Sequence, residues 1–146
     1  MKKKYIIYTA TVLISACILL FFTYSIPSNK YLANLPNVTI SSSNNETIAC
    51  ISFSSFNRTI GTNVHKDIPD TKYLVSVTPE STINLKFDDS PGEHSLSLFY
   101  DNKYLPINSS NYNFSAPKEK GIYKYKLNAR WYGKGLISYL FNVEVK

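Results

Sequence analysis

The sequence predicts an all-β protein: an antiparallel β-sandwich of seven to eight strands, preceded by one N-terminal transmembrane helix. Two observations carry this prediction. Short segments in which apolar and polar residues alternate recur at roughly ten-residue spacing, which is typical of the half-buried strands of a sandwich. Ahead of them lies a long uncharged apolar run, and no helical periodicity follows it.

The N-terminal segment predicts a membrane anchor with the domain outside the cytoplasm. Residues 5–26 carry no charge, and as a helix they would span about 33 Å at about 1.5 Å per residue, against roughly 30 Å of hydrocarbon. Residues 1–4 contain three lysines, and basic residues stay on the cytoplasmic side. We therefore expect a basic tail at 1–4, an uncleaved single-pass helix at 5–26, a stalk at 27–37 and an extracytoplasmic sandwich at 38–146.

Two alternatives to the uncleaved helix stay open. A cleavable signal peptide has an apolar region of about 7 to 15 residues, which is shorter than this run. The stretch Ile14-Ser15-Ala16-Cys17 resembles the lipobox of bacterial lipoproteins, in which the cysteine is lipidated and the chain is cut before it. Cys17 is therefore the candidate lipidation site of a secreted lipoprotein, and the domain lies outside the cytoplasm in every case.

The alternation of apolar and polar residues, with turn-forming residues between the segments, predicts the positions of the strands. The segments expected to be strands before the C-terminal hairpin are 38–40, 47–53, 73–78, 82–87, 94–100 and 103–107. The densest cluster of turn-forming residues is Asp88-Asp89-Ser90-Pro91-Gly92. Residues 54–71 show no sustained periodicity, so we expect a long connection there with at most one short strand near 59–64.

The strongest alternation lies in residues 121–146, which predict a β-hairpin that turns at Gly133-Lys134-Gly135. The side chains expected to point inward are Tyr123, Tyr125, Leu127, Ala129, Trp131, Tyr139, Phe141, Val143 and Val145. Those expected to point toward water are Lys124, Lys126, Asn128, Arg130, Ser138, Asn142, Glu144 and Lys146. We expect Trp131 to pack against the strand that carries Ile83, Leu85 and Phe87.

Residues 73–146 resemble the small immunoglobulin-like domains of short secreted, lipid-anchored or membrane-anchored proteins of Gram-positive bacteria. The motifs that carry the resemblance are Val77-x-Pro79-x-Ser81-x-Ile83-x-Leu85-x-Phe87, Pro117-Lys118-Glu119-Lys120-Gly121-Ile122-Tyr123-x-Tyr125, Ala129-x-Trp131 and Ser138-Tyr139-x-Phe141-x-Val143-x-Val145. The resemblance implies an immunoglobulin-like sandwich at the cell envelope. It implies no catalytic residue and no cofactor.

Charge and cysteine usage limit the expected partners. The net charge is +6, but three of the lysines lie in the cytoplasmic tail, so the exterior domain is only mildly basic. That balance suits an anionic wall polymer or lipid head groups, and the compartment argues against nucleic acid. Cys50 has no partner for an intrachain disulfide in the exterior part, and we expect it to be a small buried hydrophobic residue.

No pattern of an enzyme is found. No serine lies in a Gly-x-Ser-x-Gly elbow, and none has a recognisable imidazole partner in the sequence. Two groups of possible metal ligands, one of His65, Asp67 and Asp70 and one of Asp88, Asp89, Glu93 and His94, match no ligand spacing, and turns select Asp for other reasons. We therefore expect a non-enzymatic protein without metal or cofactor.

The wet face of the C-terminal hairpin is the candidate site. Lys124, Lys126, Arg130 and Tyr132 would form a flat cationic and aromatic surface for an anionic polymer or an acidic partner. The simpler interpretation is a solvated sheet face whose lysines discourage edge pairing. The expected function is a membrane-tethered, non-enzymatic binding or structural module at the cell envelope. The alternative is a protease-inhibitor-like sandwich that acts through the loop at residues 54–71.

Overall fold

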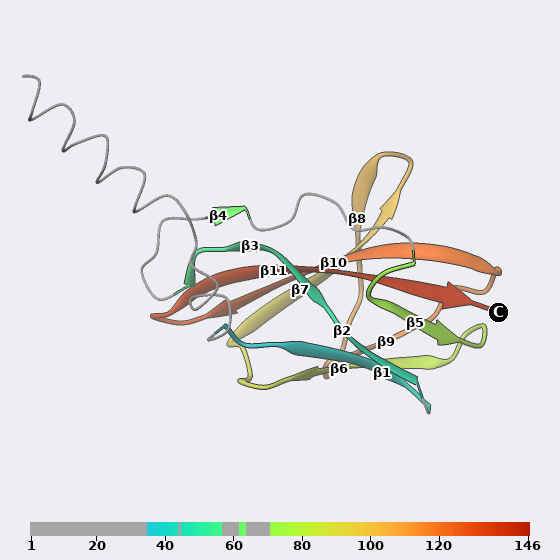
Figure 1. Ribbon diagram of the computed structural model, residues 1–146, viewed down its shortest axis with the longest axis horizontal. Coiled ribbons are helices and arrows are strands. Elements are labelled where there is room, and N and C mark those ends of the chain that lie inside the picture. Colours follow the sequence, from blue (N-terminus) through green and yellow to red (C-terminus); the bar gives the residue numbers. More distant parts are fainter. Residues whose placement is uncertain (1–34, 44, 57–61, 64–70) are drawn as a thin grey trace, which may run out of the picture. The chain divides into compact units, whose positions relative to one another are not determined.

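The computed structural model describes residues 35–43, 45–56, 62–63 and 71–146, which form an all-β structure (Figure 1). The predicted basic tail and transmembrane helix, Cys17 and most of the predicted stalk lie outside these residues. The part that is described contains no helix long and apolar enough to cross a bilayer. Residues 35–37, which the sequence assigns to the stalk, pack on the sandwich: Leu35 is buried, and the Tyr139 hydroxyl donates to the Pro36 carbonyl at 2.7 Å.

The described strands form two sheets. The small sheet has the order β2 (Asn45–Ile48), β1 (Val38–Ser42), β6 (Thr82–Phe87) and β9 (Asn113–Ser115). The large sheet has the order β4 (Thr62–Asn63), β3 (Cys50–Ser54), β11 (Gly135–Val145), β10 (Gly121–Trp131), β7 (Glu93–Tyr100) and β8 (Lys103–Ile107), and β5 (Leu74–Val77) also pairs with β11. Figure 1 shows the small sheet as one layer and the long strands β10 and β11 as the other.

The C-terminal hairpin and most of the other strands confirm the predictions. The structure describes eleven strands rather than seven to eight, because short pieces such as β2 and β9 carry too few residues for a visible alternation, and β4 is the short strand expected near 59–64. The segment 47–53, predicted as one strand, is two. The chain leaves the small sheet after Ile48 and joins the large sheet at Cys50, and the Ala49 N–H donates to the Val38 carbonyl at 2.9 Å between them.

One strand pair is parallel, which corrects the prediction of a purely antiparallel sandwich. One edge of β11 is shared: β3 pairs antiparallel with its first half, through Ile137–Leu140, and β5 pairs parallel with its second half, through Asn142–Val145. The change of partner follows an irregular register between Ser138 and Tyr139. A single long strand thus ties an early and a middle segment of the chain to the same sheet.

The core lies between the two sheets and includes most of the side chains predicted to face inward, but Tyr123 is only half-buried, and Ile137 is a core residue that was not predicted. Its buried members from the small sheet are Val38, Ile40, Ile83 and Leu85, and those from the large sheet are Leu96, Tyr125, Leu127, Ile137, Tyr139, Phe141 and Val143. Tyr125 and Phe141 stack with ring centroids 5.3 Å apart, and Phe114 of β9 meets Tyr125 at 5.1 Å. These aromatic contacts join β10 and β11 to the opposite sheet.

Trp131 faces the core, as the sequence predicts. It is 4% exposed, and its ring lies 6.3 Å from Phe87 at the end of β6 and 5.3 Å from Phe56, edge to face. Its indole Nε1–H donates to the Asp89 carbonyl at 3.0 Å. The polar end of the indole is therefore satisfied by the same turn that the sequence marks with consecutive aspartates.

The middle of the outward side of β11 is buried, which corrects the prediction for Ser138 and Asn142, whereas Glu144 is partly exposed. Ser138 and Asn142 are both buried, as is Leu140 between them, which packs with Cys50 and Tyr73. The Ser138 hydroxyl donates to Asn128 Oδ1 at 2.6 Å, and Asn142 Nδ2 donates to the Lys72 carbonyl at 3.0 Å. The chain around Lys72 and Tyr73 covers this part of β11 on its outward face. Alternation within one strand does not reveal that both of its faces are covered.

Candidate functional site

The wet face predicted for β10 continues across β7 and β8. Register places Lys124 beside Phe99, and Phe99 beside Tyr104. Because paired residues point to the same side of a sheet, three adjacent strands present one surface. We call this surface the outer strip; its residues are Lys124, Lys126, Asn128 and Arg130 of β10, Glu93, Ser95, Ser97 and Phe99 of β7, and Tyr104 and Pro106 of β8.

An aromatic pair marks one end of the outer strip. The Phe99 and Tyr104 ring centroids lie 5.1 Å apart, and the two residues are 36% and 45% exposed. Lys126 places its Nζ 5.4 Å from the centroid of the Tyr104 ring. An ammonium group over the face of an aromatic ring is attracted by the ring quadrupole, so this lysine is held in place above the ring.

A two-residue turn builds the aromatic end. Asp101 and Asn102 both have positive φ, 48° and 58°, which is the pattern of a type I′ turn that joins β7 and β8. The turn fixes Phe99 opposite Tyr104 on one face. Figure 1 shows this hairpin projecting from the body of the sandwich. The predicted strands at 94–100 and 103–107 leave room for this turn, but the aromatic pair was not among the predicted contact residues, although the alternation of the two strands would have placed it on this face.

The other end of the outer strip is polar. Arg130 is the cross-strand partner of Glu93, and the Tyr132 hydroxyl donates to Glu93 Oε1 at 2.7 Å. This hydrogen bond is the main cause that raises the pKa of Tyr132. A shallow depression of about 410 Å³ lies at this end, and it is lined by Glu93, His94, Ser95, Asn128, Arg130 and Leu136.

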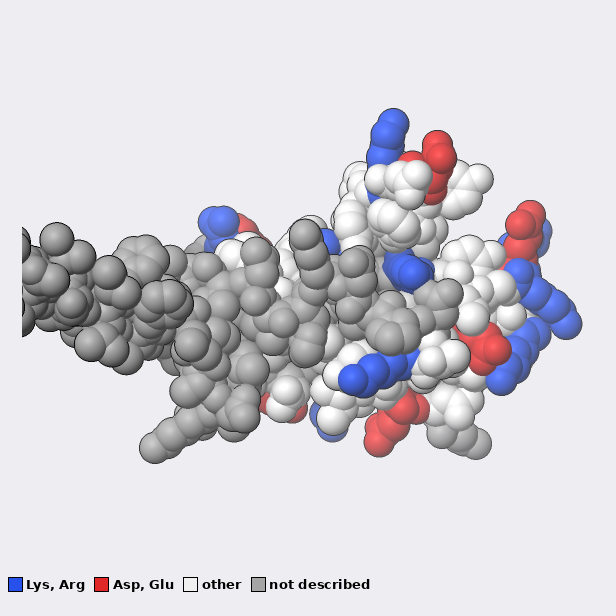
Figure 2. Space-filling view, turned by 45° about the horizontal axis from the view of Figure 1, so that its top comes forward, with Lys and Arg blue, Asp and Glu red and all other residues white. Residues whose placement is uncertain are grey.

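The four predicted contact residues therefore fall into two groups. Lys124 and Lys126 lie at the aromatic end, whereas Arg130 and Tyr132 lie around Glu93. The acidic neighbour offsets the charge of Arg130, and positive charge on the strip is concentrated near Phe99 and Tyr104. On the side drawn in Figure 2, Lys and Arg side chains are spread among acidic and uncharged residues. The distribution of charge therefore does not locate the candidate site. The Phe99–Tyr104 pair locates it at the aromatic end of the outer strip.

A serine and an imidazole meet on the other side of β7, where the sequence predicts no such partner. Ser109 Oγ lies 3.2 Å from His94 Nε2, and the His94 ring packs on Tyr112 with centroids 4.8 Å apart. Nucleophilic catalysis also needs a group that orients the base and donors for an oxyanion. Ser109 is the only hydrogen-bond partner of the His94 ring among the described residues, and their contact ties the loop after β8 to β7.

Burial lowers the pKa of His94 below its ordinary value of 6.5, which predicts a pH effect on stability. Above pH 6.5 the imidazole is neutral in both folded and unfolded chains. As the pH falls below 6.5 the unfolded chain binds the proton first, so the free energy of unfolding decreases until the lowered pKa is passed. We expect His94→Gln to reduce the stability lost between pH 7 and pH 5, as measured by urea denaturation. An unchanged loss in this variant would contradict the effect.

Cys50 is confirmed as a small buried hydrophobic residue. It is 4% exposed, and burial raises the pKa of its thiol, so the reactive thiolate is disfavoured. Of the two possible metal-ligand groups, the one with His65, Asp67 and Asp70 lies outside the described residues. In the other, Glu93 binds Tyr132 and Asp89 binds Lys134 at 2.8 Å. Nowhere in the described ranges do three ligand-type side chains gather as a metal site would require.

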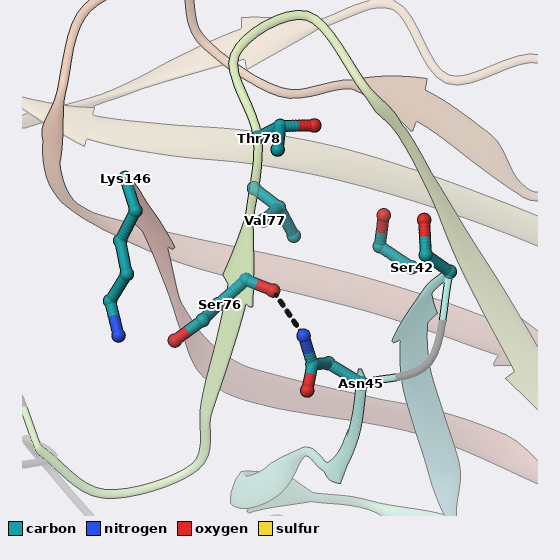
Figure 3. Close-up of a pocket in the computed structure, with 7 residues that line it drawn as sticks. Ser42, Asn45, Ser76, Val77, Thr78 and Lys146 are labelled. Carbon is teal, nitrogen blue, oxygen red and sulfur yellow. Dashed lines mark hydrogen bonds between the residues drawn. The ribbon is translucent and has the colours of Figure 1, made fainter.

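A second cavity, of about 230 Å³, lies where the β1–β2 turn meets β5 and the end of β11 (Figure 3). It is lined by Ser42, Ser43, Asn45, Ser76, Val77, Thr78 and Lys146. Asn45 Nδ2 donates to the Ser76 carbonyl at 3.0 Å across it, and Ser42 Oγ donates to Thr82. Glu144 accepts from Ser76 Oγ at 2.7 Å, which with Lys146 lowers its pKa. The polar groups around this cavity bind one another, and the hydrogen bond between Asn45 and Ser76 connects the two sheets. We therefore do not take the cavity as a ligand-binding site.

Most of the loop at residues 54–71, assigned to protease inhibition in the alternative function, lies outside the described residues. Within it the structure describes Ser54, Ser55, Phe56, the short strand β4 and Thr71. Among the candidate surfaces, the outer strip is therefore the one whose residues the structure describes.

Comparison with protein-family models, with curated proteins and with solved structures finds no match to this chain.

Proposed function

We propose that this protein is a membrane-tethered, non-enzymatic binding module of the cell envelope, built as an immunoglobulin-like sandwich, and that it binds its partner through the outer strip. The partner is an anionic wall polymer or an acidic envelope protein. The observation that carries the proposal is the exposed Phe99–Tyr104 pair with Lys126 held over one ring. An exposed aromatic and cationic group on a rigid sheet is typical of a binding surface.

The strand pairing supports the immunoglobulin-like part of the proposal. In such sandwiches one sheet is formed around the last two strands, and a third strand lies beside them. Here β7, β10 and β11 take these positions, and β6 with β9 forms the opposite layer. A tyrosine near the start of the penultimate strand commonly bonds to the backbone a few residues upstream. Tyr123 matches it: its hydroxyl donates to the Glu119 carbonyl at 2.8 Å.

The anchor is proposed from the sequence alone, on the length of the uncharged run at 5–26. The mature protein should begin at Met1 and should partition with membranes. N-terminal sequencing and detergent-phase partitioning test this. A mature chain beginning at a lipidated Cys17 would instead establish the lipoprotein alternative, and one beginning beyond Ser25 would show cleavage of a signal peptide.

Photo-crosslinking from the surface of the sandwich tests the binding function. A benzophenone amino acid replaces Ser97, in the middle of the outer strip, in cells that express the full chain. The control replaces Lys86, which is exposed on the outer side of the small sheet. We expect adducts of higher mass from position 97 and none from position 86. Equal adducts from both positions, or none from position 97, would overturn binding through the strip.

A further inference from the structure

The chemistry of the outer strip identifies a class of ligand. Its one acidic residue, Glu93, lies beside Arg130 at the polar end, and Lys124 and Lys126 lie on β10 at the aromatic end. Alternate residues of a strand are about 6.8 Å apart, so these two lysines are spaced along the strand. Cations spaced in this way complement a ligand whose negative charges are also arranged in a line.

The size of the strip argues against a folded protein partner. From Lys124 to Arg130 it extends about 20 Å along β10, and three strands at about 4.8 Å spacing make it about 10 Å wide. The resulting flat footprint of about 200 Å² is small beside the roughly 800 Å² of accessible surface that each partner buries in a stable protein–protein interface, so a folded protein would have to contact residues beyond the strip. A narrow linear chain can use such a strip, because it needs only the groups along its own length.

The edge of the sheet argues against an extended peptide. A peptide strand would have to pair with β8, which lies at the end of the large sheet. Pro106 lies within β8 and has no N–H to donate, and proline on an edge strand is a common protection against added strands. Recognition at this place is therefore through side chains on the face of the sheet.

The aromatic pair indicates that the ligand contains rings. The C–H-bearing face of a sugar ring is a flat apolar surface, and it packs on an aromatic ring as another apolar surface does. Phe99 and Tyr104 offer such a platform with Lys126 beside it, and the polar depression at the other end supplies the amide of Asn128 and the hydroxyl of Ser95 for sugar hydroxyls. A ringless phosphodiester chain would leave the platform unused.

We propose that the outer strip binds a linear polysaccharide whose sugar rings carry carboxylates: one ring lies on Phe99 and Tyr104, its carboxylate pairs with Lys126, and later rings follow β10 toward Asn128. This ligand class rests on the proposed binding function and makes it specific. The interaction is electrostatic in part, so its affinity falls as salt is added.

The test measures binding of the full chain, kept in a nonionic detergent, to three polymers of similar length by isothermal titration calorimetry. They are polygalacturonate, the neutral polysaccharide dextran and the ringless polyanion polyphosphate. We expect binding to polygalacturonate alone. Tyr104→Ala and Lys126→Gln should each weaken it by about fivefold or more. Matched controls outside the strip, Tyr100→Ala with 65% exposure and Lys86→Gln, should change it by less than twofold.

The outcomes separate this inference from the proposed function. Equal binding of polyphosphate, or binding that Tyr104→Ala and Lys126→Gln leave unchanged, overturns the proposal that the ligand is an acidic polysaccharide. If none of the three polymers binds while the photo-crosslinker at position 97 forms a protein adduct, the polysaccharide proposal is also wrong, but the proposed binding function stands. If neither polymer binding nor a crosslink is found, both are wrong. Circular dichroism of each variant shows that a loss of binding is not a loss of fold.

Discussion

Trp131→Ala should leave the sandwich largely unfolded. The substitution removes a 4% exposed indole that contacts Phe56 and Phe87 and donates to the Asp89 carbonyl. Truncation of a buried aromatic residue costs about 3 to 5 kcal/mol, a large part of the roughly 5 to 15 kcal/mol available to a typical domain. Trp131 is the only tryptophan, so the substitution also removes the tryptophan fluorescence that would report unfolding. Urea denaturation is therefore followed by far-UV circular dichroism.

Tyr100→Ala is the matched aromatic control, since Tyr100 is 65% exposed. It should change the free energy of unfolding by no more than about 0.5 kcal/mol. The sequence alone predicts the same small effect for Lys126→Ala, but the contact of Lys126 with the Tyr104 ring raises the expected cost to about 1 kcal/mol. A Trp131→Ala midpoint equal to that of the wild type would mean that the tryptophan does not lie in the core.

Gly135→Ala should destabilise the fold by about 3 kcal/mol or more. Gly135 has φ of +130°, which side-chain-bearing residues rarely adopt, and an added Cβ would collide with the backbone carbonyl of Ser55. The Ser55 N–H donates to the Leu136 carbonyl at 2.8 Å, so the segment cannot move away without disturbing the junction of β3 with β11. Backbone strain and overpacking each cost about 1 to 3 kcal/mol.

Gly133→Ala is the control in the same turn. Gly133 has φ of +74°, and an added Cβ would meet nothing within 4 Å. Only the backbone cost remains, about 1 to 2 kcal/mol for a left-handed conformation. Urea denaturation should therefore order the stabilities as wild type, then Gly133→Ala, then Gly135→Ala. Equal losses for the two variants would show that the contact with Ser55 has no energetic weight.

The sequence predicts the part of the candidate site that lies on β10, but not the parts on β7 and β8. The alternation of β10 places Lys124, Lys126 and Arg130 on one face, and a strand pattern is a local property of the sequence. The partners on that face come from β7 and β8, and only the pairing register puts Phe99 beside Lys124 and Glu93 beside Arg130. The chemistry of the two ends depends on those neighbours, so it could not be read from one strand.

The all-β class, the C-terminal hairpin, and the burial of Trp131 and Cys50 could all be predicted from the amino-acid sequence. Each of these depends on periodicity or composition within one segment. The division of residues 45–54 between two sheets at Ala49 and the parallel pairing of β5 with β11 could not be predicted without the fold. The same is true of the burial of Ser138 and Asn142. Segments that are far away in the sequence pair with the edges of a strand and cover its second face. The side-chain pattern of the strand itself shows only that successive residues alternate between the two faces.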